Sequence, residues 1–160
     1  MKYLLWIVVL ISLSGCITVP QLPEELKYVM PSSDETGISS IHATMIDDKV
    51  PLFDDDNTYV YAINGKKVML EEEQWNQPVF ITPGPHDITL GFTKGAHMLF
   101  AKVHLNVTTS TAYKAMSACK TGFLGNFEYC DFWIVDSATG KAVSDVSRGA
   151  YTDRRHPLNL

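Results

Sequence analysis

His97-Met98-Leu99-Phe100-Ala101-Lys102-Val103-His104-Leu105-Asn106-Val107 is the stretch of this chain that decides its fold. From Leu99 to Val107 every odd-numbered position is apolar, whereas the even-numbered positions are mostly polar or charged. Alternation at period two places the two sets on opposite faces of an extended strand. We therefore predict a half-buried β-strand over 97–107, with one face in the core and the other mostly in water.

The same pattern extends outward from this strand in both directions. Ile88, Leu90 and Phe92 also alternate with polar or small residues, and Asn64-Gly65 suits a tight hairpin because both residues accept positive φ. Strands are predicted near 40–48, 58–63, 66–70, 78–82, 86–93, 97–107, 110–118, 127–135 and 141–146. Short strands without long amphipathic helices predict an all-β fold, an antiparallel β-sandwich of Ig-like or transthyretin-like type with about seven to nine strands; a small barrel is the alternative.

The chain divides into four predicted parts: a signal peptide with a signal helix over 1–15, a flexible lipidated tether over 16–38, the β-sandwich domain over 39–146, and a loose C-terminal tail over 147–160. The whole chain has 13 Lys and Arg against 18 Asp and Glu, a net charge of −5. Phosphate binding depends on clustered cations, so this balance argues against a nucleic-acid partner.

The first 15 residues have the layout of a secretory signal: one cation at Lys2, an apolar run over 3–11, and then small residues. A spanning helix needs about 20 apolar residues, so this run is too short to cross a bilayer. Leu13-Ser14-Gly15-Cys16 resembles the lipobox of bacterial lipoproteins. That resemblance implies a diacylglyceryl thioether at Cys16, cleavage just before it, and acylation, for example with palmitate, of the freed amine. A plain signal peptide, or a buried apolar helix with an incidental cysteine, is the alternative.

The resemblance also implies a location. In enterobacterial lipoproteins an aspartate directly after the lipidated cysteine favours the inner membrane, and this chain has Ile17 there. The expectation is a protein anchored by lipid in the bacterial outer membrane, with its domain facing the periplasm. Its expected partners are the bilayer, through the acylated Cys16, and an unidentified envelope protein or cell-wall component.

A second resemblance covers residues 58 to 107. Tyr59-Val60-Tyr61-Ala62-Ile63-Asn64-Gly65-Lys66 followed by Pro78-Val79-Phe80-Ile81-Thr82-Pro83-Gly84-Pro85-His86-Asp87-Ile88-Thr89-Leu90 resembles PEGA-type domains, in which a strand and an Asn-Gly-Lys turn precede a second hairpin. The resemblance implies a small β-sandwich of binding or structural type, like those of other envelope lipoproteins, without inherited catalytic residues.

With Cys16 assigned to lipid, Cys119 and Cys130 are left as a pair in an oxidising compartment. We predict that they form a structural disulfide between two strands; a redox or metal-binding pair is the alternative. The segment between them presents Phe123 and Leu124, which form a possible interaction loop unless they pack into the core.

The other reactive side chains do not form a catalytic pattern. The five histidines are expected to be surface or packed residues, and the acidic run Asp54-Asp55-Asp56-Asn57 lacks the spacing and the glycine of a calcium loop. No nucleophile elbow, His-Glu-x-x-His helix or phosphate-binding glycine loop occurs. We therefore expect no metal, no cofactor and no enzymatic activity. The histidines are His42, His86, His97, His104 and His156.

The resulting hypothesis is a membrane-anchored envelope lipoprotein that acts as a non-enzymatic binding or structural module. Its candidate contacts are the 119–130 loop and the aromatic side chains of Tyr59, Tyr61, Trp75 and Phe100, expected to be exposed. Two alternatives stay open: a small periplasmic hydrolase, including a metal-dependent enzyme that uses His and Asp, and an inhibitor or immunity-like protein that inserts the loop into a partner.

Overall fold

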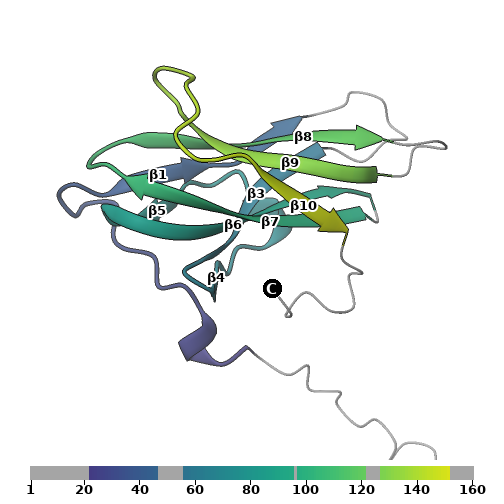
Figure 1. Ribbon diagram of the computed structural model, residues 1–160. Coiled ribbons are helices and arrows are strands. Elements are labelled where there is room, and N and C mark those ends of the chain that lie inside the picture. Colours follow the sequence, from purple (N-terminus) through teal and green to yellow (C-terminus); the bar gives the residue numbers. More distant parts are fainter. Residues whose placement is uncertain (1–21, 47–55, 96, 122–126, 152–160) are drawn as a thin grey trace, which may run out of the picture.

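A computed structural model describes residues 22–46, 56–95, 97–121 and 127–151 as two β-sheets packed face to face (Figure 1). The strands are β1 (Ser39–His42), β2 (Thr44–Ile46), β3 (Asp56–Ile63), β4 (Lys66–Lys67), β5 (Val79–Ile81), β6 (Gly84–Lys94), β7 (His97–Val107), β8 (Ala112–Thr121), β9 (Phe127–Asp136) and β10 (Ser147–Tyr151). Two 3-10 turns, η2 (Glu24–Leu26) and η3 (Glu72–Gln74), accompany them. The predicted all-β sandwich is confirmed. No helix among the described residues is long and apolar enough to span a membrane.

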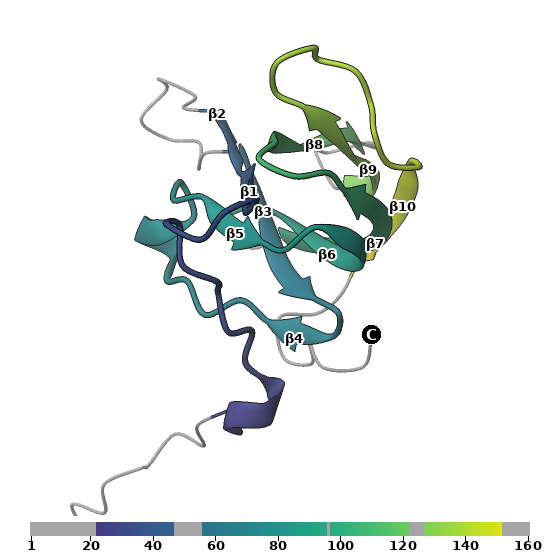
Figure 2. The same cartoon turned by 90° about the vertical axis from the view of Figure 1, so that its left-hand side faces the viewer.

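Sheet 1 consists of β2, β3, β4, β6 and β7, and sheet 2 consists of β1, β5, β8, β9 and β10. The two sheets are joined along both sides (Figure 2). On one side β10 pairs with β9 in sheet 2 and with β7 in sheet 1; on the other, β1 and β2 follow each other directly but belong to different sheets. All strand pairs are antiparallel except β1 with β8, which is parallel.

The β6–β7 hairpin forms the centre of sheet 1, as its alternation predicts. Its register runs without interruption from Gly84 opposite Val107 to Lys94 opposite His97. The inward side chains of both strands are fully or almost fully buried: Ile88, Leu90, Phe92, Leu99, Ala101, Val103, Leu105 and Val107. Burial of this apolar surface, at about 25 cal/mol per Å², is the main favourable term for the fold.

The C-terminal part of the domain differs from the prediction. No strand occupies 141–146, where only an isolated bridge joins Ala142 to Val135. The tail expected to be loose from Ser147 instead begins with β10, so the prediction is wrong for 147–151. Gly149 explains why alternation does not show this strand: a Cβ there would lie 2.5 Å from Cε2 of Phe132, so the position must lack a side chain.

Side chains on the outer surface also hold β10 against β9. The Arg148 guanidinium donates two hydrogen bonds to the Asp131 carboxylate, at 2.8 and 3.1 Å, and lies 3.7 Å from the centre of the Tyr129 ring. The hydrogen bond from Arg148 lowers the pKa of the Asp131 carboxyl. Because this cluster faces solvent, it contributes little to the free energy of folding and mainly fixes the orientation of the Arg148 side chain.

The segment predicted as a flexible tether is partly attached to the domain. The Tyr28 backbone N–H donates to the Lys67 carbonyl at 2.8 Å, and the Tyr28 hydroxyl donates to the Phe80 carbonyl at 3.0 Å. The ring packs against the core, and burial raises the pKa of its hydroxyl to about 12. Of the predicted tether, residues 16–21 lie outside the described residues. The attachment at Tyr28 is a tertiary contact that no local pattern indicates.

Two of the aromatic side chains proposed as exposed contacts are in fact buried. Tyr59 and Phe100 are only 4% exposed, on the outer face of sheet 1 on either side of Gly91. A Cβ at residue 91 would lie 2.7 Å from the Tyr59 ring, so the missing side chain lets the rings fold over the sheet. Trp75 then stacks on Tyr59 with ring centres 3.8 Å apart. These residues form a small second layer over sheet 1.

Candidate binding pocket

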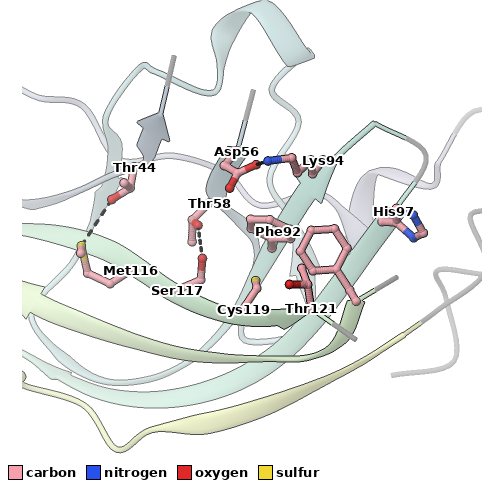
Figure 3. A pocket seen from close by; sticks show the side chains of 11 residues that line it. Thr44, Asp56, Thr58, Phe92, Lys94, His97, Met116, Ser117, Cys119 and Thr121 are labelled. Carbon is pink, nitrogen blue, oxygen red and sulfur yellow. Dashed lines mark hydrogen bonds and ion pairs between the residues drawn. The ribbon is translucent and has the colours of Figure 1, made fainter. Parts of the chain in front are cut away.

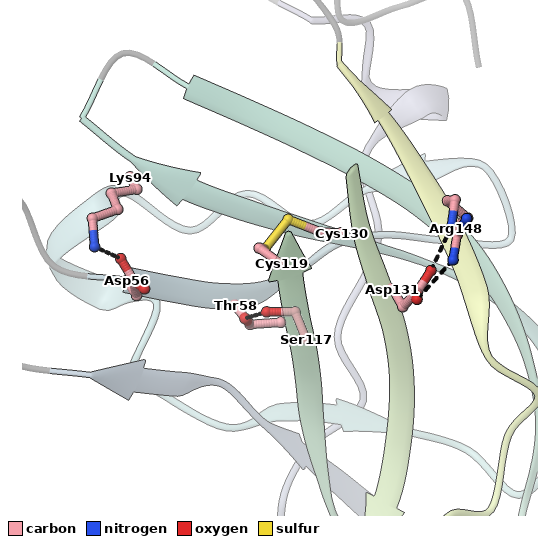
Figure 4. Close-up of a disulfide and its surroundings, with 8 residues drawn as sticks. All are labelled: Asp56, Thr58, Lys94, Ser117, Cys119, Cys130, Asp131 and Arg148. Carbon is pink, nitrogen blue, oxygen red and sulfur yellow. Dashed lines mark hydrogen bonds and ion pairs between the residues drawn. A yellow bond between two sulfur atoms is a disulfide. The ribbon is translucent and has the colours of Figure 1, made fainter. Parts of the chain in front are cut away.

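The predicted disulfide is present, between residues directly opposite each other on β8 and β9 (Figure 4). Cys130 is completely buried, whereas Cys119 is half-buried. The bridge closes a loop with a sequence separation of 11 and so restricts the unfolded chain. Cys16, Phe123 and Leu124, the other predicted site residues, lie outside the described residues.

The inward-facing side chains of the sandwich change from apolar to partly polar along its strands. On β6 the inward series Ile88, Leu90 and Phe92 continues to Lys94. On β8 the inward series Tyr113 and Ala115 continues to Ser117. Positions that face the core are normally apolar, because burying an unpaired polar group costs free energy. At one end of the molecule the inward faces nevertheless include polar residues.

These polar inward residues line a pocket between the two sheets (Figure 3). Its volume is about 500 Å³, within the usual range of ligand pockets. Sheet 1 contributes Thr44, Asp56, Thr58, Phe92, Lys94 and His97; sheet 2 contributes Met116, Ser117, Cys119, Thr121 and Phe127. The pocket therefore combines an apolar lining with a few polar groups, which is typical of sites for small molecules.

An ion pair links two strands of sheet 1 beside the pocket. The Lys94 ammonium at the end of β6 lies 2.7 Å from Oδ1 of Asp56 at the start of β3, and each side chain is 28% exposed. Oδ1 is shielded from solvent, and no described residue donates an aligned hydrogen bond to it. The carboxylate is therefore balanced in charge but keeps unused capacity to accept a hydrogen bond.

Hydrogen bonds join the two sheets at the pocket: the Thr44 hydroxyl on β2 donates to Met116 Sδ on β8 at 3.4 Å, and a second contact joins β3 to β8. The Thr58 hydroxyl on β3 and the Ser117 hydroxyl on β8 are 2.6 Å apart (Figure 4). Thr58 is 3% exposed, and the residues next inward on the same faces, Val60 and Ala115, belong to the packed core. This pair marks the boundary between pocket and core. Each hydroxyl can still make further hydrogen bonds, because a hydroxyl is one donor and two acceptors.

Aromatic rings form the apolar part of the lining. Phe92 from sheet 1 and Phe127 from β9 meet edge to face, with ring centres 5.3 Å apart, and His97 meets the same Phe127 ring at 5.4 Å. The disulfide fixes the neighbouring part of β8 and β9, since Cys119 also lines the pocket. Rings from both sheets thus hold this end of the sandwich in a defined geometry.

The pocket and the attached tether lie at opposite ends of the same strands. β3 begins at the pocket with Asp56 and ends at Ile63, next to the Asn64 turn and the groove beneath Tyr28. Eight residues of strand separate the two ends by about 25 Å. Any attachment made through the N-terminal segment therefore lies at the end of the domain opposite the pocket.

The other reactive side chains have structural explanations. His86 supports the Asn64-Gly65 hairpin: its ring nitrogens lie 2.9 Å from Asn64 Nδ2 and from the Thr82 carbonyl. His104 pairs with Asp87 at 3.0 Å, but both side chains are more than half exposed on the outer face. Across the described ranges, no group of three or more His, Cys, Asp or Glu residues could hold a metal ion.

Sequence reasoning did not identify the pocket, although the signal was present. Extending the inward register of 86–93 by one position reaches Lys94, and extending that of 97–107 back to its start reaches His97. Both are polar residues on a core face. That Asp56 and Ser117 meet them there depends on the packing of the two sheets, which no local pattern reveals.

Comparison of the chain with protein-family models, with curated proteins and with solved structures gives no match.

Proposed function

We propose that this protein is a membrane-anchored envelope lipoprotein whose β-sandwich is a non-enzymatic binding module, with the pocket between the sheets as its binding site. One observation supports this proposal most directly: at the end opposite Tyr28 the interior of the sandwich carries polar side chains among apolar ones and leaves a pocket of about 500 Å³. A module that only filled space would have no reason to keep Asp56 and Lys94 on core-facing positions.

The anchor determines where the pocket is presented. From Cys16 to the docked Tyr28 the chain can extend by no more than about 40 Å. Several acyl chains on Cys16 would hold the protein on a bilayer essentially permanently. The pocket lies about 25 Å from the attachment point, at the opposite end of β3. Confinement to this thin layer raises the effective concentration of the pocket for other envelope components.

Binding is better supported than catalysis. The Ser117 hydroxyl lies 2.6 Å from the Thr58 hydroxyl, which is not a general base, so this contact joins the sheets without activating a nucleophile. The pocket is mostly apolar, and its Lys94 and Asp56 side chains form an ion pair. No observation favours the inhibitor alternative, because Phe123 and Leu124 lie outside the described residues.

Crosslinking in intact cells tests the proposal. A photoreactive benzoylphenylalanine replaces Thr121 at the pocket or, as a matched control, the exposed Thr109 at the other end of the domain. We expect products from residue 121 that are absent from residue 109, and membrane release of a Cys16→Ser variant. The same products from both positions would remove the pocket as the binding site. A mature chain with an unmodified thiol at residue 16 would remove the anchor.

A further inference from the structure

The pocket also indicates the chemistry of its ligand, an inference that rests on the proposed binding function. Among the described lining residues the formal charges are one ammonium, Lys94, and one carboxylate, Asp56, which face each other at 2.7 Å. A strongly charged ligand would have to enter a mostly apolar space and compete with this pair, at a cost in desolvation. The pocket is therefore suited to an uncharged ligand.

The apolar residues that line the pocket indicate the shape of the ligand's apolar part. Phe92 and Phe127 present ring edges and faces, and Met116 and the Cys119 sulfur add polarisable surface. Aromatic rings favour edge-to-face and offset contacts with other rings, and sulfur makes favourable contacts with ring edges. A planar aromatic group, or a branched aliphatic group of similar size, fits this lining best.

The spare hydrogen-bonding capacity of the Asp56 carboxylate defines the polar part of the ligand. Oδ1 of Asp56 is shielded from solvent, accepts no aligned hydrogen bond from the described residues, and belongs to a side chain that lines the pocket. Oδ1 pairs with the Lys94 ammonium at 2.7 Å, but a carboxylate oxygen has more than one lone pair and can accept a further hydrogen bond from a ligand N–H or O–H. The Thr58 and Ser117 hydroxyls can supply secondary contacts.

We propose that the pocket binds a small, uncharged amphiphile that has an aromatic or branched aliphatic body and one N–H or O–H donor directed at Asp56. The donor separates this class from plain hydrocarbons, and the neutral head separates it from fatty acids and other anionic amphiphiles.

Three probes of nearly the same shape test this class on the folded domain. N-Phenyl-1-naphthylamine is neutral and has an N–H donor, 1-phenoxynaphthalene replaces that donor by an ether oxygen, and 8-anilinonaphthalene-1-sulfonate adds a negative charge. Binding is measured by fluorescence, with the ether measured as a competitor. We expect the amine to bind about tenfold more tightly than either relative. In Asp56→Leu the preference for the amine over the ether should disappear.

Two filling variants locate the binding. Ser117→Trp occupies the boundary of the pocket and Thr121→Trp its exposed rim, whereas Thr109→Trp is the matched control at the other end. We expect the first two to abolish amine binding and the control to leave it unchanged, with circular dichroism verifying the fold. Equal or tighter binding of the sulfonate, still blocked by Ser117→Trp, would overturn the ligand class and leave the pocket as a site. Amine binding that survives both filling variants, or no binding of any probe, would overturn the pocket as well.

Discussion

The two ends of the sandwich are built from the same strands but filled differently. At the tether end the inward residues Ile63, Ile88 and Leu105 are fully buried, and Tyr28 packs against the core that they belong to. At the pocket end the corresponding faces carry Asp56 and Lys94 and leave a cavity. The comparison shows that the tether end stabilises the fold through apolar packing, whereas the pocket end is less densely packed and leaves a cavity that can hold a ligand.

The sharpest test of this division is a truncation at the packed end. Ile88→Ala should lower the free energy of unfolding by about 3 kcal/mol, because it removes fully buried methyl groups and leaves a cavity. Thr121→Ala at the pocket rim should change it by less than about 0.5 kcal/mol. Urea unfolding of both variants measures the difference. Equal losses at the two ends would contradict the division.

The next largest effect concerns the disulfide, which compensates for weaker packing at the pocket end. Replacing both Cys119 and Cys130 by alanine should cost about 2–4 kcal/mol. Hydrogen exchange should show faster opening of β8 and β9 near the pocket than of the β6–β7 centre. Uniform loosening of the whole domain would argue that the bridge has no special role at this end.

A smaller effect is expected from Tyr28→Phe at the tether end. Loss of the hydroxyl bond to the Phe80 carbonyl should cost about 1 kcal/mol. Burial raises the pKa of Tyr28 from 10.0 to about 12, so the folded state favours the neutral hydroxyl. Its contribution is present below pH 10 and is lost as pH rises from 10 toward 12. Limited proteolysis within residues 22–38 measures this. The wild type should be cleaved more slowly than Tyr28→Phe at pH 10, and the difference should disappear as the pH approaches 12.

The smallest effect is predicted for the hydroxyl pair at the pocket boundary. Thr58→Val with Ser117→Ala removes both partners together, so unfolding should change by less than about 1 kcal/mol. Thr58→Val alone should cost more than the double variant, because it leaves the Ser117 hydroxyl without this partner. A double-mutant cycle by thermal unfolding gives the coupling energy. A large decrease in the free energy of unfolding of the double variant would indicate that Thr58 and Ser117 belong to the core.

Much of the sheet structure follows from local patterns. The alternation over 97–107 predicts β7 with its correct bounds, and Asn64-Gly65 forms the predicted tight turn with φ of 50° and 76°. The assignment of Cys16 to lipid leaves Cys119 and Cys130 as a pair, and the predicted bridge between them is present. β10 was missed, because a strand held between β7 and β9 by tertiary pairing needs no alternation of its own. The buried Tyr59 and Phe100 were missed for a similar reason, since the space above Gly91 is a property of the folded sheet.

The sequence by itself determined the all-β class and the central hairpin, because period-two alternation and turn residues act over short range. It also predicted the pairing of Cys119 with Cys130, on the expectation that Cys16 carries lipid. Only the tertiary structure decided that Asp56, Lys94, Thr58 and Ser117 share one pocket and that Tyr28 attaches to the opposite end. These residues lie on different strands, and their distances depend on how two twisted sheets pack, a long-range outcome that no single segment contains.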